Sequence, residues 1–281
     1  MSKGQKIFAV LLVLIAGLAA CLSFHDSRGN VKGLNEKKDD KAEIIFLDVG
    51  QGDAILIQQG RTQVLIDGGD GQQILNRLGR FMPFGDNKVD FVVVTHPDED
   101  HMGGLIKVLE SYEVGEILES GIDCDKDICE KWEELIAKGE IETLNAKLGQ
   151  NIRFGEDIDL SVLYPFSDLS DVEFKNSNEA SLVLKAVVED RKYLLMADTE
   201  NKTEKELMAS NLNLDADVLK VSHHGSKSAT SADFLMEVTP EKAVISVGEN
   251  SYGHPTEEVL TRLSNMNIEI LRTDEEGSIA F

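Results

Sequence analysis

Residues 92–104, VVVTHPDEDHMGG, form the most informative stretch of the chain. Four side chains that bind metal ions well fall within six consecutive residues of it: His96, Asp98, Asp100 and His101. The apolar run before them predicts a buried strand, and the two glycines after them allow a sharp turn. Two imidazoles and two carboxylates so close together would repel and desolvate one another unless a cation neutralised them. The stretch therefore predicts a metal site, because an ordinary polar loop would not account for this pattern of histidines and aspartates.

Further polar groups follow other predicted strands at the point where each strand ends. They are Asp67 after residues 64–66, Asp198 after 193–196, His223 and His224 after 218–221, and His254 after 243–247. Layered α/β folds gather their chemistry at the carboxyl ends of strands, because rigid elements hold the loops there. Each of these residues, taken singly, is more often structural or solvated. Their shared placement predicts a common site.

Seven motifs follow one another along the chain. They are LDVGQGDAILI (47–57), LIDGG (65–69), HPDEDHMGG (96–104), NSNEASLVL (176–184), ADTE (197–200), HHGS (223–226) and YGHP (252–255). In this order they resemble the metallo-β-lactamase fold, and most closely its competence-type branch, the soluble hydrolase domain of ComEC-like DNA-uptake proteins. The resemblance implies a four-layer αββα sandwich over residues 43–281, with a two-metal site at one edge. Short apolar runs interleaved with helical stretches also favour a layered α/β domain.

The resemblance implies that His96 and Asp98 bind the first of the two ions, with Asn178 or water completing the set. In many members of the wider superfamily a histidine stands at the position of Asp98. No histidine occurs between residues 101 and 223, so the usual middle histidine ligand is missing, and Asn178 lies closest to its place. Such an oxygen-rich set leaves both zinc and manganese open.

The second ion would be bound by Asp100, His101 and His223, and Asp198 would bridge the two ions. His224 can exchange roles with His223, because spacing does not distinguish neighbours in a loop.

The expected chemistry is hydrolysis. Two divalent ions a few ångströms apart lower the pKa of a shared water from about 15.7 towards 7 and so supply hydroxide at neutral pH. Asp100 would orient that hydroxide, and Asp67 would fix a ligand imidazole. His224 or His254 could protonate the leaving oxygen, and a neutral structural role is the alternative for His254.

The N-terminal segment, residues 1–24, predicts export. Two lysines precede IFAVLLVLIAGLAA, and Leu18-Ala19-Ala20-Cys21 fits a bacterial lipobox. Cleavage before Cys21 and its lipidation would make a lipoprotein, and an uncleaved anchor is the alternative. Both interpretations place the protein outside the cytoplasmic membrane and tethered to it. Residues 25–42 are polar and lack periodicity, which predicts a flexible tether.

Cys124 and Cys129 are the remaining cysteines. In an oxidising exterior they could form a disulfide that closes GIDCDKDICE, and a pair of free surface thiols is the alternative.

The net charge of −23 opposes tight, extended binding of nucleic acid, because proteins that grip phosphates present a basic face. Lys220 and Lys227 flank HHGS, and two metal ions would add positive charge at the site. We therefore expect an extracytoplasmic phosphodiesterase or nuclease acting on single strands. The alternatives are a small ester, lactone or β-lactam hydrolase, and a non-catalytic surface binding protein. We expect a stand-alone domain, without the multi-span channel of competence proteins, and the oligomeric state stays open.

Overall fold

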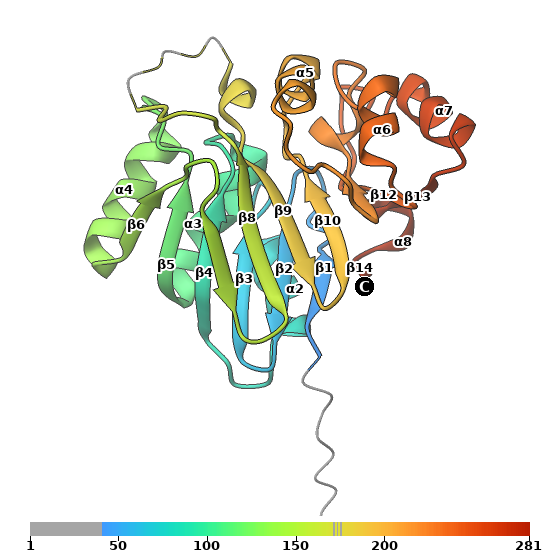
Figure 1. Cartoon of the computed structure of the whole chain (residues 1–281). Helices are drawn as coiled ribbons and strands as arrows, with labels where there is room; N and C mark the ends of the chain where they lie inside the picture. Colours follow the sequence, from blue (N-terminus) through green and yellow to red (C-terminus); the bar gives the residue numbers. More distant parts are fainter. Residues whose placement is uncertain (1–40, 171, 173, 175) are drawn as a thin grey trace, which may run out of the picture. The chain divides into compact units, whose positions relative to one another are not determined.

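The computed structural model describes residues 41–170, 172, 174 and 176–281. Two mixed sheets of seven strands each form its centre (Figure 1). The first has the order β14-β1-β2-β3-β4-β5-β6. Its strands are β1 (Glu43–Phe46), β2 (Ile55–Gln59), β3 (Thr62–Ile66), β4 (Lys88–Val94), β5 (Glu113–Glu119), β6 (Glu142–Asn145) and β14 (Ile279–Ala280). Strands β3 to β6 run parallel, whereas β14, β1 and β2 pair antiparallel.

The second sheet has the order β13-β12-β11-β10-β9-β8-β7. Its strands are β7 (Asn151–Phe154), β8 (Ile158–Tyr164), β9 (Val183–Val188), β10 (Arg191–Leu195), β11 (Val218–Lys220), β12 (Lys242–Ile245) and β13 (Glu269–Arg272). Strands β10 to β13 run parallel, and β7 to β10 pair antiparallel. Parallel neighbours need a crossover, and helices supply it in both sheets.

Helices cover the outer face of each sheet (Figure 1). Those on the first sheet are α2 (Gln73–Phe81), α3 (Glu99–Ser111) and α4 (Asp127–Gly139). Those on the second are α5 (Asn201–Ala209), α6 (Ala232–Val238) and α7 (Glu257–Asn265). Shorter elements are α8 (Thr273–Glu276) and the 3-10 turns η1 (Ser177–Ala180) and η2 (Ser222–Gly225).

Alternation of side chains along the strands builds three apolar layers. On β4, Phe91 and Val93 enter the core between the two sheets, and Val92 and Val94 pack under the helices. A strand buried on both faces reads as a continuous apolar run, which is why residues 91–94 carry no polar alternation. The predicted four-layer αββα sandwich is confirmed.

The expectation of a sharp turn at Gly103 and Gly104 is wrong, because both lie inside α3. A Cβ atom on Gly104 would lie 1.9 Å from the carbonyl oxygen of Gly68. The amide of Gly104 donates to the carbonyl of Gly69, and the amide of Gly68 donates to that of His101. The glycines are therefore needed for close packing of the helix on a neighbouring loop, and not for chain reversal.

Cys124 and Cys129 form a disulfide that closes the loop before α4, with their Cα atoms 6.0 Å apart. Cys129 and Trp132 of that helix are buried against the first sheet. The predicted signal or anchor segment, Cys21 and the predicted tether up to residue 40 lie outside the described residues. In the part of the chain that the structure describes, no helix is both long and apolar enough to cross a membrane.

Candidate metal centre

The functional side chains gather where β3, β4, β10 and β11 end. Asp98 is the N-cap of α3, so Asp100 and His101 lie in the first turn of that helix. Carboxylates are favoured there by the partial positive charge of the helix N-terminus. Asp198 follows β10, and His224 belongs to η2, which follows β11. The two sheets thus contribute opposite sides of one site.

Asp67 and Thr95 orient two imidazole rings from behind. The Oδ2 atom of Asp67 lies 2.8 Å from Nδ1 of His101. The Thr95 hydroxyl donates to the same oxygen at 2.7 Å and lies 3.0 Å from Nδ1 of His96, and the Thr95 amide donates to Oδ1 of Asp67. With the Nδ1 sides so occupied, both rings present Nε2 to the centre of the site, as a metal site requires of its histidines.

Three carboxylate–imidazole contacts define that centre. Oδ1 of Asp198 lies 3.2 Å from Nε2 of His101 and 3.4 Å from Nε2 of His224. Oδ2 of Asp100 lies 3.4 Å from Nε2 of His224. Among the described residues, three groups of donor atoms lie close enough to share an ion, and two of them face this centre: His96 with His101 and Asp198, and Asp100 with His101 and His224. In the third, Asp67 and Asp53 already accept hydrogen bonds from Thr95 and Lys220.

The donor atoms in the two groups that face the centre lack other partners. The Nε2 atoms of His96, His101 and His224 and Oδ1 of Asp198 are buried and make no hydrogen bond to any described residue. Buried polar atoms without partners are costly, and a set of three imidazole nitrogens and carboxylate oxygens suits a divalent transition metal. The residues present therefore fit bound metal ions.

Electrostatic interactions within the cluster keep its side chains ionised. Burial raises the pKa of Asp198, but the positive charge of His224 and His101 outweighs it and holds this pKa well below its usual value. Burial likewise opposes ionisation of Asp100, yet the close, positively charged ring of His224 and the charge of His101 lower its pKa to about 2. Burial lowers the pKa of His101 and of His224, and the neighbouring carboxylates, Asp198 first, reverse this and raise both above the usual value.

His223 and His224, which spacing could not distinguish, differ clearly in position. The side chain of His224 is buried, whereas that of His223 is 23% exposed. Nε2 of His223 lies 3.7 Å from Oδ2 of Asp198, and its Nδ1 lies 3.6 Å from Glu200. Asn178 Nδ2 lies 3.4 Å from the same Nδ1. Both histidines have positive φ, 46° and 51°, a costly conformation for these residues that collects at functional sites.

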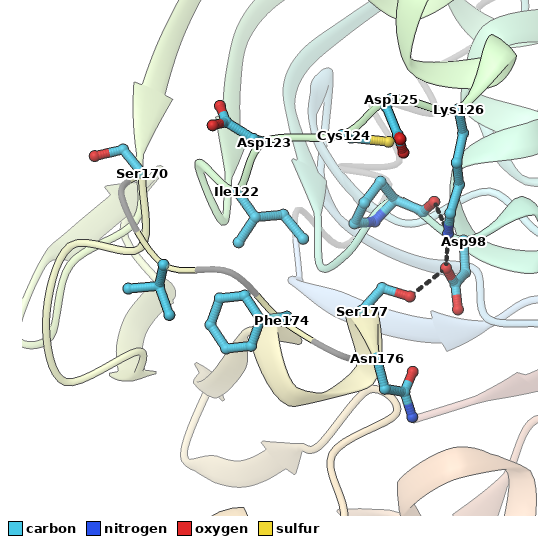
Figure 2. Close-up of a pocket in the computed structure, with 12 residues that line it drawn as sticks. Asp98, Ile122, Asp123, Cys124, Asp125, Lys126, Ser170, Phe174, Asn176 and Ser177 are labelled. Atoms are coloured by element: carbon cyan, nitrogen blue, oxygen red, sulfur yellow. Dashed lines mark hydrogen bonds and ion pairs between the residues drawn. The ribbon is translucent and has the colours of Figure 1, made fainter.

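Asp98 divides its two carboxylate oxygens between different partners. Oδ2 lies 3.5 Å from Nε2 of His96, whereas Oδ1 accepts hydrogen bonds of 2.5 Å from both Lys126 and Ser177 (Figure 2). Burial raises the pKa of Asp98, but the close contact with His96 and its charge, together with the hydrogen bonds from Lys126 and Ser177, hold this pKa far below its usual value. A pocket of about 790 Å³ opens beside it, with Ile122 on its wall. Lys126 stands inside the disulfide loop, which thus reaches a predicted metal ligand.

Sequence reasoning missed Asp53 and Ser246, and it treated Lys220 only as a positive charge flanking HHGS, whereas that side chain is buried and paired. The buried Lys220 ammonium donates to Oδ2 of Asp53 at 2.6 Å, and Oδ1 of Asp53 lies 3.4 Å from Nδ1 of His224. That Nδ1 also lies 2.8 Å from the carbonyl oxygen of Ser246. The signal was a lysine inside the apolar run DVLKV and the closing aspartate of DVGQGD. In that motif Gly52 has φ 114°, and a Cβ there would lie 2.0 Å from the carbonyl oxygen of Asp100.

His254 lies at the rim and not in the centre. Its ring centroid is 5.4 Å from that of His223 and 5.9 Å from that of Tyr252. Burial lowers the pKa of His254, and the charges of His223 and His224 lower it further. The ring is neutral near pH 7 and a poor proton donor, which favours the structural alternative.

A family model of the metallo-beta-lactamase superfamily matches residues 47–249. The chain is 31% identical over 264 residues to ComE operon protein 3 of Bacillus subtilis, with 86% of this chain and 33% of that protein covered. It is 30% identical over 247 residues to competence protein ComA of Neisseria gonorrhoeae, with 86% of this chain and 32% of that protein covered. The chain therefore spans about a third of the length of these relatives.

Among solved structures, the metallo-beta-lactamase fold protein YhfI of Bacillus subtilis matches with a TM-score of 0.57 at 13% identity, over 86% of this chain and 99% of that one. This likeness shows a shared fold. The layered sheets, the strand-end cluster and the family match agree, and the chain belongs to the metallo-beta-lactamase superfamily, related there to competence proteins.

Proposed function

We propose that this protein is an extracytoplasmic phosphodiesterase that cleaves single-stranded nucleic acid with two bound divalent ions. Its family and its buried His/Asp clusters make it a metal-dependent hydrolase. The observation that carries the two-ion proposal is the pair of neighbouring donor groups, with His96 in one and Asp100 and His224 in the other. His101 lies within reach of both groups, and we assign it to the second ion. The likeness to competence proteins supports a phosphodiester as the substrate.

The proposed first ion is held by His96 and by Oδ2 of Asp98, with Asn178 or water. Asp98 suits this role because Lys126 and Ser177 fix its other oxygen. Zinc and manganese both suit the mixed nitrogen and oxygen set.

Asp100, His101 and His224 would hold the proposed second ion, and Asp198 lies within reach of both donor groups. We choose His224 over His223 because its buried Nε2 lies 3.4 Å from both Asp100 and Asp198.

Two bound divalent ions would supply a nucleophilic oxygen at neutral pH and withdraw charge from a phosphoryl oxygen. The residues do the remaining work. Asp100 holds the attacking oxygen in line, and Asp67 keeps His101 in one orientation. His223 is partly exposed beside the Glu200 carboxylate, and we assign it the proton that the leaving oxygen takes up.

Export and lipidation at Cys21 would place this activity at the outer side of the cytoplasmic membrane. The disulfide between Cys124 and Cys129 supports that location, since disulfides persist mainly in oxidising compartments.

The test is metal analysis of the purified protein together with a substrate panel. We expect about two divalent ions per chain and turnover of single-stranded DNA and of bis(p-nitrophenyl) phosphate, abolished by chelation and restored by zinc or manganese. Turnover of a lactam or lactone without turnover of either diester would refute the phosphodiesterase. Absence of metal, with an unchanged melting temperature on chelation, would refute the metal centre.

A further inference from the structure

Tyr252 is a large aromatic side chain exposed beside the metal centre. It is 74% exposed, and its ring lies nearly parallel to that of His254, with 27° between the planes. The His254 ring in turn meets the edge of His223, whose Nε2 lies 3.7 Å from Asp198. A line of rings thus runs from solvent to the metal cluster.

The loop that carries Tyr252 is internally organised. The Asn250 side chain accepts hydrogen bonds of 3.1 Å from the amides of Tyr252 and His254. Its amide nitrogen donates to the carbonyl oxygens of Gly248 and His254. Four hydrogen bonds of the Asn250 side chain hold the backbone on both sides of Tyr252, so the loop holds this residue in a fixed position.

Both ends of this loop are tied to motifs of the site. At one end, Gly248 packs so closely on Gly50 that an added Cβ would lie 2.3 Å from its backbone. At the other end, the amide and hydroxyl of Thr256 both donate to the carbonyl of Gly225, the third residue of HHGS. The position of Tyr252 is therefore coupled to the two loops that carry Asp53 and His224.

We propose that Tyr252, supported by His254, is a stacking platform for an unpaired base that flanks the scissile phosphodiester. The proposal rests on the proposed function and adds the feature of the substrate that is recognised. Stacking on an aromatic ring tolerates any base and needs no positive charge. It thus gives a protein with a net charge of −23 a means to hold nucleic acid without a basic groove. A paired base would be unable to reach the ring, which restricts the substrate to single strands.

The experiment compares Tyr252→Ala and Tyr252→Phe with the wild type. Phe84→Ala is the matched control, because Phe84 is also a fully exposed aromatic residue. It lies before the start of β4, whereas the metal centre lies after the end of that strand. The substrates are a thymidine hexanucleotide and a hexamer of the same backbone with abasic residues. Initial rates give KM and kcat for each pair.

Loss of a stacked base is worth about a five- to hundredfold change in affinity. We expect Tyr252→Ala to raise the KM of the base-bearing strand by that factor, with kcat changed far less and the abasic KM unchanged. Tyr252→Phe and Phe84→Ala should behave as the wild type. An equal effect of Tyr252→Ala on both substrates, or no effect on either, overturns the platform.

Binding separates this proposal from the proposed function. Anisotropy of a fluorescent thymidine hexanucleotide reports the platform even where no hydrolysis occurs. Weaker binding by Tyr252→Ala and not by Tyr252→Phe supports the platform, whatever the reaction proves to be. Unchanged binding by Tyr252→Ala overturns it, while hydrolysis of both substrates by the wild type would leave the phosphodiesterase standing.

Discussion

The neighbouring histidines of HHGS lie in different surroundings, and both have positive φ. His224 is buried with Nε2 between Asp100 and Asp198, and its Nδ1 meets Ser246 and Asp53. His223 is left at the edge of the cluster. The strained backbone at these two positions accompanies the separation of two adjacent imidazoles.

We expect His224→Ala to lose about one of two metal equivalents, because its nitrogen has no substitute in that group. His223→Ala should keep both metals and lose turnover instead. Elemental analysis and diesterase rates on both variants check this. Loss of metal from His223→Ala with full loading of His224→Ala would contradict the assignment.

Asp100 and Asn178 provide a second contrast. In the proposed site, Asp100 would bind metal and orient the attacking oxygen, whereas Asn178 would offer one neutral oxygen that water can replace. Asp100→Asn should retain the fold and lower turnover about 100-fold or more. Asn178→Ala should mainly weaken the affinity for one ion. Rates at saturating manganese separate the two, and equal losses would show a wrong assignment of the site.

Metal binding should depend on pH through His101 and His224. Their pKa values are raised in the metal-free fold, so carboxylate–imidazolium pairs stabilise it below about pH 6.5, and this contribution is lost as pH rises through the raised values. Asp100, with its lowered pKa, stays ionised throughout. Metal must displace the ring protons, so metal affinity should rise from about pH 6 to 9.

Calorimetry in buffers of different ionisation enthalpy counts the released protons. His254→Gln is the control, since the lowered pKa of His254 leaves no proton there to release near pH 7. Zinc or manganese binding without proton release near pH 6 would contradict this account.

At the scale of elements, the site depends on how closely α3 approaches the loop after β3. A Cβ added to Gly104 would lie 1.9 Å from the carbonyl oxygen of Gly68, far inside van der Waals contact. Gly104→Ala must therefore push the helix away from the loop, and with it Asp100 and His101. We expect a loss of about 1–3 kcal/mol in unfolding free energy and weaker metal binding.

Gly79→Ala is the matched control, because that glycine lies in α2 with nothing within 4 Å of an added Cβ. It should be neutral or slightly stabilising. Urea unfolding of both variants checks the prediction, and equal stability of Gly104→Ala and the wild type would show that the close approach is not needed.

At the scale of the whole molecule, the acidity of the chain bears on the proposed membrane attachment. A chain with a net charge of −23 does not attract phosphate groups from solution over long distances. Tethering at the membrane would instead keep the protein where its substrate passes. Cys21→Ala should abolish lipid labelling and release or misplace the protein. Fractionation and labelling of cells test this. Membrane attachment with unchanged mobility in Cys21→Ala would instead favour the uncleaved anchor.

The sequence by itself determined the layered fold and the family, because strand periodicity and seven ordered motifs are local signals. It also identified the polar residues at the strand ends. The structure brings His96, Asp100, His101 and Asp198 into one cluster, and their roles as ligands stay predictions.

Tertiary structure alone decided what depends on contacts between distant segments. It placed His224 and not His223 at the centre, and it paired Lys220 with Asp53, 167 positions away in the chain. It also showed that Gly104, expected in a turn, lies where a helix packs closely on a loop. Spacing within a motif says which side chains are neighbours in the chain. Which nitrogen meets which oxygen depends on the docking of two sheets, and no local pattern encodes that.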